Sequence, residues 1–148
     1  MRSDAKDGPP AGEASHGEIT YQGHDHFTIS LAGNPAYSFS DNQRLAHEFE
    51  HGRQVLDGEL SFINTPTGWK PFAHDRTDEA EGFAAGFDIE RASPGQGSFI
   101  NNMQQKLDQG GISAAAQFLG TGGSPYRNLP EGPINVEYST SSIYKVPQ

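Results

Sequence analysis

Apolar and polar residues alternate along residues 18–31, which read EITYQGHDHFTISL. Alternation with a period of two, in a stretch rich in threonine and aromatic residues, is typical of strands with one buried face. Gly23 interrupts the alternation. The pattern therefore predicts two short strands, one on each side of this glycine. A further run, INVEYST at 134–140, predicts a strand late in the chain.

A helical period begins after Ser40, which is followed three positions later by Gln43. A serine and a glutamine at this spacing fit a capping box, in which each side chain accepts from the backbone N–H of the other residue. We therefore expect a helix from 41 to 56, ended by Gly58. Its apolar stripe consists of Leu45, Phe49 and Leu56 together with Gly52.

A second helix is predicted from near Thr77, its expected N-cap, to about residue 91. Asp78, Glu79 and Glu81 fall in its first turns, where the helix dipole favours negative charge. Apolar residues then recur at helical spacing down to Phe87.

The segments between and after these two helices predict further helices and a loop or hairpin. Residues 59–76 show no periodicity and predict a loop or a short hairpin. Residues 98–109 and 112–119 predict a third and a fourth helix, separated by a pair of glycines. The predicted elements together indicate an α+β fold with a small antiparallel sheet.

A chain of 148 residues is long enough for one domain with a buried core. Residues 1–16 contain no apolar run and are expected to form a disordered leader, which leaves 17–148 as the domain. The leader also lacks the apolar region of a secretory signal, and no segment is apolar enough to span a bilayer. We therefore expect no targeting segment and no membrane partner.

Ten basic and nineteen acidic residues give a formal net charge of −9. The basic residues are scattered singly, without the patch that a phosphate backbone needs, so we expect no nucleic-acid partner. The chain contains no cysteine, which excludes disulfides, thiolate zinc sites, iron–sulfur clusters and cysteine nucleophiles. Any bound metal must be held by histidine and carboxylate side chains.

The first predicted helix contains the segment HEFEH, in which His47 and His51 are four residues apart and Glu48 directly follows the first histidine. Residues four apart lie on one face of a helix, so both imidazoles can reach one zinc ion (Zn2+). Glu48 lies about 100° further round, where it can contact a metal-bound water without binding the metal. An HExxH segment on a helix is typical of zinc peptidases. The alternative is two exposed histidines on an amphipathic helix.

A catalytic zinc also needs a third protein ligand and an open position for water. The second predicted helix places Glu79 on one face with Gly82 and Gly86, two small residues that would let it pack closely against the HExxH helix. A glutamate followed three residues later by a small residue, on a second helix, is the gluzincin arrangement. Glu79 is therefore the predicted third ligand.

Other third ligands remain open, namely Glu81, Asp78, His74 and Asp57. Asp57 follows His47 by ten residues, which is the spacing of the third ligand in metzincins, but Gln54 stands where those enzymes need a glycine. His74 lies in a segment without periodicity and is also a candidate donor of a hydrogen bond to the tetrahedral intermediate.

The segments LAHEFEHGRQVLDGEL and DRTDEAEGFAAGFDIE resemble the short zinc-metallopeptidase domains that end bacterial polymorphic toxins and secreted effectors. The resemblance extends over about residues 17–140 and implies a minimal zincin-like fold, with a small sheet, the HExxH helix and a ligand-bearing helix behind it. It also implies hydrolysis of a peptide bond in a target-cell protein, an immunity protein as a partner, and delivery from a bacterial cell by a specialised route. By the same resemblance, Tyr126 or Arg127 in SPYRN would stabilise the oxyanion.

The expected mechanism follows from these roles. Zinc, held by His47, His51 and Glu79, polarises the scissile carbonyl, while Glu48 takes a proton from the metal-bound water and passes it to the leaving amine. The second hypothesis is a catalytically inactive, zinc-stabilised binding module. The presence of Glu48, which a purely structural zinc site does not need, favours the enzyme.

Overall fold

A computed structural model describes residues 17–21, 27–31 and 39–145 of the chain, with side chains described from residue 39 onward. The helices are α1 (Asp41–Leu56), α2 (Arg76–Ile89) and α3 (Ser98–Leu119), with a 3-10 turn at Pro94–Gln96. The strands are β1 (Gly17–Tyr21), β2 (Phe27–Leu31), β3 (Ser61–Thr65) and β4 (Gly68–Phe72). The expected leader at 1–16 lies outside the described residues.

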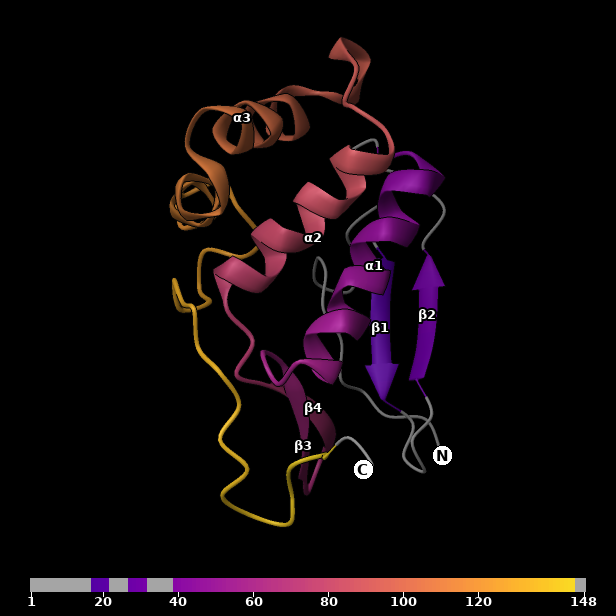
Figure 1. Cartoon of the computed structure of the whole chain (residues 1–148), viewed down its shortest axis with the longest axis vertical. Coiled ribbons are helices and arrows are strands. Elements are labelled where there is room, and N and C mark those ends of the chain that lie inside the picture. Colours follow the sequence, from indigo (N-terminus) through magenta and orange to yellow (C-terminus); the bar gives the residue numbers. More distant parts are fainter. Residues whose placement is uncertain (1–16, 22–26, 32–38, 146–148) are drawn as a thin grey trace.

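The strands form two separate antiparallel hairpins, which confirms the α+β class. β1 and β2 are the two short strands that the alternation predicted. They pair with each other, and this hairpin lies beside α1 (Figure 1). β3 pairs with β4, so the segment after α1 forms the short hairpin that was one of its two predicted states. The zincin-like fold, with a ligand-bearing helix behind the HExxH helix, is a finer statement than this agreement supports and stays a prediction.

The predicted strand at 134–140 is wrong. Residues 134–139 have no regular secondary structure, and the pairing with β3 is made further along the chain. Ile143 forms a bridge with Ile63, and Tyr144 donates to the carbonyl of Phe62 at 2.8 Å. A strand needs a free sheet edge, and β3 is only five residues long. Ile143 and Tyr144 occupy the free edge of β3, and the segment INVEYST is an irregular connection that leads to them.

Helix α1 has the predicted bounds and the predicted cap. Ser40 Oγ accepts from the backbone N–H of Gln43 at 3.1 Å, and Gln43 Oε1 accepts from the N–H of Ser40 at 3.0 Å. The apolar stripe, however, is not the buried face, since Phe49 is 60% exposed and Leu56 is 68% exposed. The buried face of α1 carries mostly polar residues: Gln43, Arg44, His47, Glu48, His51, Gln54 and Val55. Burying so many polar groups is costly unless they have partners, so this face calls for a functional explanation.

Helix α2 begins two residues earlier than predicted. Its N-cap is Asp75 rather than Thr77, and Asp75 Oδ1 accepts from the N–H of Asp78 at 2.9 Å. The other oxygen of Asp75 accepts from the N–H of Ile134 at 2.7 Å. The cap therefore fixes the C-terminal segment to the start of α2, and this long-range contact is absent from any local pattern.

We predict that Asp75→Ala lowers the free energy of unfolding by about 1–3 kcal/mol, because a helix cap is lost and the N–H of Ile134 loses its acceptor in a part-buried hydrogen bond. Thr77→Ala is the matched control, since the Thr77 hydroxyl only donates to an exposed carbonyl and its loss should cost under about 0.5 kcal/mol. Urea denaturation of the two variants measures the difference. Equal losses in the free energy of unfolding would contradict the assignment of Asp75 as the N-cap of α2.

Helices α1 and α2 cross at close range, with α3 on the far side of α2 (Figure 1). The close approach depends on two glycines of α2. A Cβ at Gly82 would lie 2.8 Å from Cε1 of His47, and a Cβ at Gly86 would lie 2.9 Å from the carbonyl oxygen of Gln43. Small residues on this face of α2 were predicted to allow such packing, and the structure confirms it.

The apolar core lies between α2 and α3. Its buried members are Ala80, Phe83, Phe87, Ile100, Met103, Ala115, Ala116, Leu119 and Tyr126. The expected break between the third and fourth helices is a kink within α3, where Gly111 has a φ of 70°. Only glycine adopts such a backbone easily, and Gly111 is non-helical, so the glycine pair separates two helical segments of this span as predicted.

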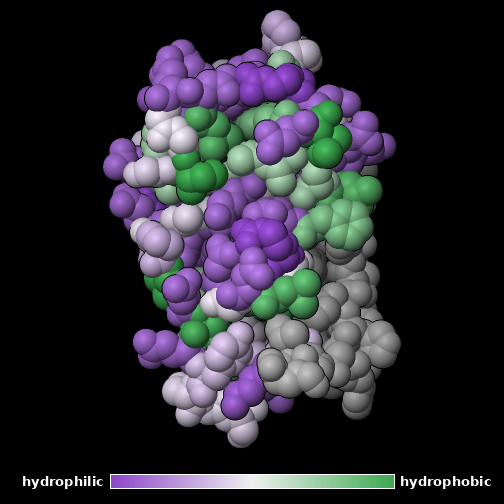
Figure 2. Space-filling view, viewed as in Figure 1, coloured by the Kyte–Doolittle hydropathy of each residue, from purple (hydrophilic) through white to green (hydrophobic). Residues whose placement is uncertain are grey.

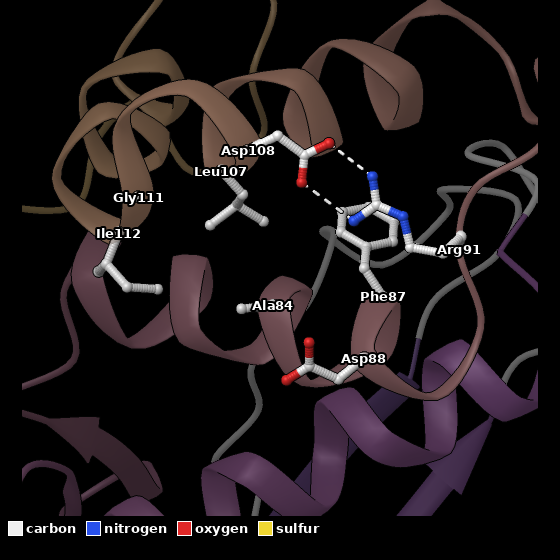
Figure 3. A pocket seen from close by; sticks show the side chains of 8 residues that line it. All are labelled: Ala84, Phe87, Asp88, Arg91, Leu107, Asp108, Gly111 and Ile112. Atoms are coloured by element: carbon white, nitrogen blue, oxygen red, sulfur yellow. Dashed lines mark hydrogen bonds and ion pairs between the residues drawn. The ribbon is translucent and has the colours of Figure 1, made fainter.

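Figure 2 shows hydrophilic side chains over the middle of one face, with apolar side chains around them. A hollow of about 240 Å³ lies between α2 and α3, and an ion pair between Arg91 and Asp108 closes one side of it (Figure 3). α1 lies on the opposite side of α2 from this hollow. Among the described residues, no helix is both long and apolar enough to cross a membrane.

Candidate metal centre

His47 and His51 lie on successive turns of α1 and face α2. Their ring centroids are 4.8 Å apart, and their side chains are 4% and 0% exposed. The alternative of two exposed histidines is therefore wrong. The ring of His47 packs edge-on against Phe83 and lies against Gly82, so the neighbouring helix limits its orientation.

Glu79, one turn into α2, brings one carboxylate oxygen to each histidine. Its Oε1 lies 3.1 Å from Nε2 of His47, and its Oε2 lies 3.2 Å from Nε2 of His51. The side chain is completely buried. Ligand atoms at 2.0–2.1 Å from a tetrahedral zinc are about 3.3 Å from one another. The two separations are of this size, although they end on different oxygens of Glu79 and are also the length of ordinary hydrogen bonds, so the three side chains converge without a ligand geometry being defined.

The electrostatics of Glu79 favour its charged form. Burial raises the pKa of Glu79, but the positive charge that His51 can carry, together with hydrogen bonds from His47, His51 and His74, outweighs burial and holds this pKa well below its ordinary value. A buried carboxylate of this kind needs a positive partner. A proton on an imidazole or a metal ion between the three side chains would meet that need.

Glu48 lies beside this group on α1. One nitrogen from each of His47 and His51 and one oxygen of Glu48 all lie within 4.8 Å of one another. Glu48 Oε1 is 4.0 Å from Nε2 of His47, and the side chain is 2% exposed. Glu48 therefore lies close enough to the histidine nitrogens to share an ion with them, and its role as a base rather than a ligand stays a prediction.

His74 contacts the carboxylate of Glu79. Its Nε2 lies 2.6 Å from Oε2 of Glu79, and its side chain is 10% exposed. Burial lowers the pKa of His74, but the hydrogen bond and charge of Glu79, with the charges of Asp78 and Asp75, raise it above its ordinary value. His74 was open as a third ligand or as a donor to the intermediate, and its contact instead supports the carboxylate.

The other candidate ligands point elsewhere. Asp57 is an exposed partner of Arg53 beyond the end of α1. Asp78 accepts from the N–H of Asp75 at 3.0 Å, and burial together with the charge of Asp75 raises the pKa of Asp78 to about 8. Glu81 accepts from Gln54 and approaches Glu59, and burial with the charge of Glu59 raises the pKa of Glu81 to about 7.

Two features of the site are not singled out by the sequence pattern. Gln54 has its Oε1 2.8 Å from Nδ1 of His51, so it is a direct neighbour of a predicted ligand. The contact between His74 and Glu79 is the second. A local signal exists only for Gln54, which follows His51 by three residues on the same helix.

The residues expected at the oxyanion have other contacts. Tyr126 is buried in the core, where its ring centroid lies 6.1 Å from that of Phe83. Arg127 donates to the carbonyl of Ser124 at 2.9 Å. These contacts give both residues a part in holding the segment after α3, and their oxyanion role stays a prediction.

No protein-family model, no curated protein and no solved structure matches this chain. The resemblance to toxin-type zinc peptidase domains therefore stays a prediction that depends on the two quoted segments. The evidence for function is the arrangement of side chains between α1 and α2.

Proposed function

We propose that the chain is a zinc-dependent peptidase of the HExxH type with a gluzincin-like ligand set. His47, His51 and Glu79 would hold the ion, and Glu48 would act as the general base. The observation that carries the proposal is the convergence of both histidine Nε2 atoms on the Glu79 carboxylate at 3.1 and 3.2 Å. The resemblance further suggests that the chain is delivered from a bacterial cell as a toxin or effector and that an immunity protein is its partner.

The donor set suits zinc better than calcium or magnesium. Two imidazole nitrogens and one carboxylate oxygen form a typical set for zinc, whereas calcium and magnesium prefer oxygen ligands. Two neutral imidazoles and one carboxylate would leave one net positive charge on the bound ion. A bound zinc ion with that charge supplies a Lewis acid and lowers the pKa of its water to about 7.

Glu48 would carry out the proton transfers of the reaction, while the histidines hold the ion. Glu48 accepts a proton from the attacking water and gives it to the amine as the peptide bond breaks, so no proton is gained or lost overall. His47 and His51 stay neutral while they act as ligands. His74 hydrogen-bonds to Oε2 of Glu79, which would limit the rotation of this carboxylate away from the histidines.

A zinc-stabilised binding module is the second candidate, and the burial of the site favours it. Glu48 is 2% exposed and His51 is 0% exposed, whereas a catalytic site must admit a substrate. A structural zinc site would bind the ion equally well but would show no hydrolysis. Zinc content and peptide cleavage therefore have to be measured on the same preparation.

The test of the proposed function combines elemental analysis with digestion of a peptide library. The peptidase predicts one zinc per chain and cleavage that stops when a chelator removes the zinc and returns when zinc is added back. Bound zinc without cleavage would support the binding module. A chain without zinc affinity would contradict both candidates.

We also predict that Gly82→Ala weakens zinc binding by about tenfold or more, because the added Cβ would lie within 3.0 Å of three atoms of the His47 ring and would displace it. Alanine has the higher helix propensity, so the fold itself should persist. Gly122→Ala, where a Cβ meets nothing within 4 Å, is the matched control. Competition with a chromophoric chelator measures both affinities, and an unchanged value for Gly82→Ala would contradict the placement of His47.

A further inference from the structure

Gln54 connects the two helices at the centre of the site. It lies on α1 one turn after His51, and its side chain is completely buried. Its Oε1 is 2.8 Å from Nδ1 of His51. Its Nε2 donates to the backbone carbonyl of Asp78 at 2.9 Å and to Glu81 Oε1 at 3.0 Å. One side-chain amide thus joins an imidazole on α1 to the first turn of α2.

The two bonds made by the amide nitrogen determine which end of Gln54 faces the imidazole. The nitrogen has two N–H groups and no acceptor, and both N–H groups point at oxygens. The amide oxygen is therefore the atom beside His51, and an oxygen can only accept there. His51 must then carry a proton on Nδ1, which leaves Nε2 facing Glu79.

We propose that Gln54 is a positioning residue for the metal, which fixes His51 as the Nδ1–H tautomer with its Nε2 lone pair directed at the ion. This inference rests on the proposed function, since it requires an ion between His51 and Glu79. The carbonyl that Gln54 uses belongs to Asp78, the residue before Glu79. The same amide therefore also fixes the distance between two ligands that come from different helices.

A neutral amide fits this position better than the carboxylate that often supports a zinc-bound histidine. Asp78, Glu81 and Glu59 each have a carboxylate oxygen within 4.8 Å of the others, close to the nitrogen end of Gln54. A glutamate at 54 would face Glu81 and repel it, and it could not donate to the carbonyl of Asp78. A glutamine supports His51 without adding negative charge.

The test compares Gln54→Met with Gln43→Met. Gln43 is a second completely buried glutamine of α1, but its amide nitrogen donates to the carbonyl of Glu90, away from the histidines. Each methionine removes one buried amide of similar size, and Gln43→Met also removes the capping-box contact with Ser40, so the control variant includes the general loss of stability. We expect Gln54→Met to weaken zinc binding by about 10–100-fold, and Gln43→Met to change it by less than about twofold.

A second measurement uses the unaltered chain and does not depend on either variant folding. In the zinc-loaded wild-type protein, nitrogen-15 NMR should show a slowly exchanging proton on Nδ1 of His51, because the hydrogen bond to Gln54 protects this proton from exchange. A proton on Nε2, or equal zinc affinities in the two variants, would overturn the role of Gln54. A wild-type chain that binds no zinc would instead overturn the proposed function, so the two failures are distinguishable.

Discussion

Glu48→Gln is expected to bind zinc as the wild type does and to hydrolyse peptides about 10²–10⁴-fold more slowly. Glutamine has nearly the same size and shape as glutamate but cannot take a proton from water. The Glu48 side chain contributes no ligand in the proposed site, so its replacement should leave His47, His51 and Glu79 in place. Zinc content and the rate of cleavage of a peptide selected from the library measure the two effects on one sample.

Glu50→Gln is the matched control for this change. Glu50 lies two residues further along α1, where its carboxylate pairs with Arg53 at the surface. The same chemical change there should alter the cleavage rate by less than about twofold, since surface substitutions have small effects. Full activity in Glu48→Gln would remove Glu48 from the mechanism, and loss of zinc from that variant would make Glu48 a ligand.

His51→Ala is expected to abolish zinc binding and, with it, the stabilisation that zinc gives to the fold. Two donors hold zinc much less tightly than three, and Glu79 would lose the partner that lies 3.2 Å from its Oε2. An ion that binds only the folded state stabilises it by about 4 kcal/mol at a thousand times its Kd. Thermal denaturation with and without zinc should therefore show a large shift for the wild type and none for His51→Ala.

Val55→Ala is the control for loss of packing on the same helix. Val55 is buried in α1 and is not a predicted ligand, so its truncation should cost about 0.5–3 kcal/mol while keeping the zinc-dependent shift. A shift of wild-type size in His51→Ala would show that zinc stabilises the chain from another position, and it would contradict the ligand assignment.

Local signals were sufficient to predict α1. The capping box of Ser40 and Gln43 lies within four residues, and the structure confirms both its hydrogen bonds and the bounds of the helix. The start of α2 was predicted two residues late because Thr77 and Asp75 are both good N-cap residues. Asp75 forms a capping box with Asp78 and also accepts from the N–H of Ile134, which is 59 residues further along the chain. The second contact cannot be read from a short window.

The buried face of α1 could not be identified from hydrophobicity. The exposed Phe49 and Leu56 form the apolar stripe, whereas the two histidines and Gln54 are buried. Sequence patterns assume that buried residues are apolar, and this assumption fails where polar side chains converge on a site. The HExxH spacing was the stronger guide, because two imidazoles that are to share an ion must lie on one helix face whatever their polarity.

The choice of Glu79 among five candidates followed from the small residues that share its helix face, and the structure brings Glu79 to both histidines. Supporting contacts were harder to foresee. His74 reaches Glu79 from the segment before α2, and Gln54 reaches Asp78 from another helix. Such contacts depend on how α1 and α2 cross, which a single sequence does not specify.

Anomalous diffraction at the zinc absorption edge, from crystals of the wild-type chain grown with one equivalent of zinc, tests the central claim most directly. We predict one strong peak between α1 and α2, about 2.0–2.1 Å from Nε2 of His47, from Nε2 of His51 and from one oxygen of Glu79. A peak elsewhere, or no peak between these three side chains, would contradict the assignment of a metal centre to this chain.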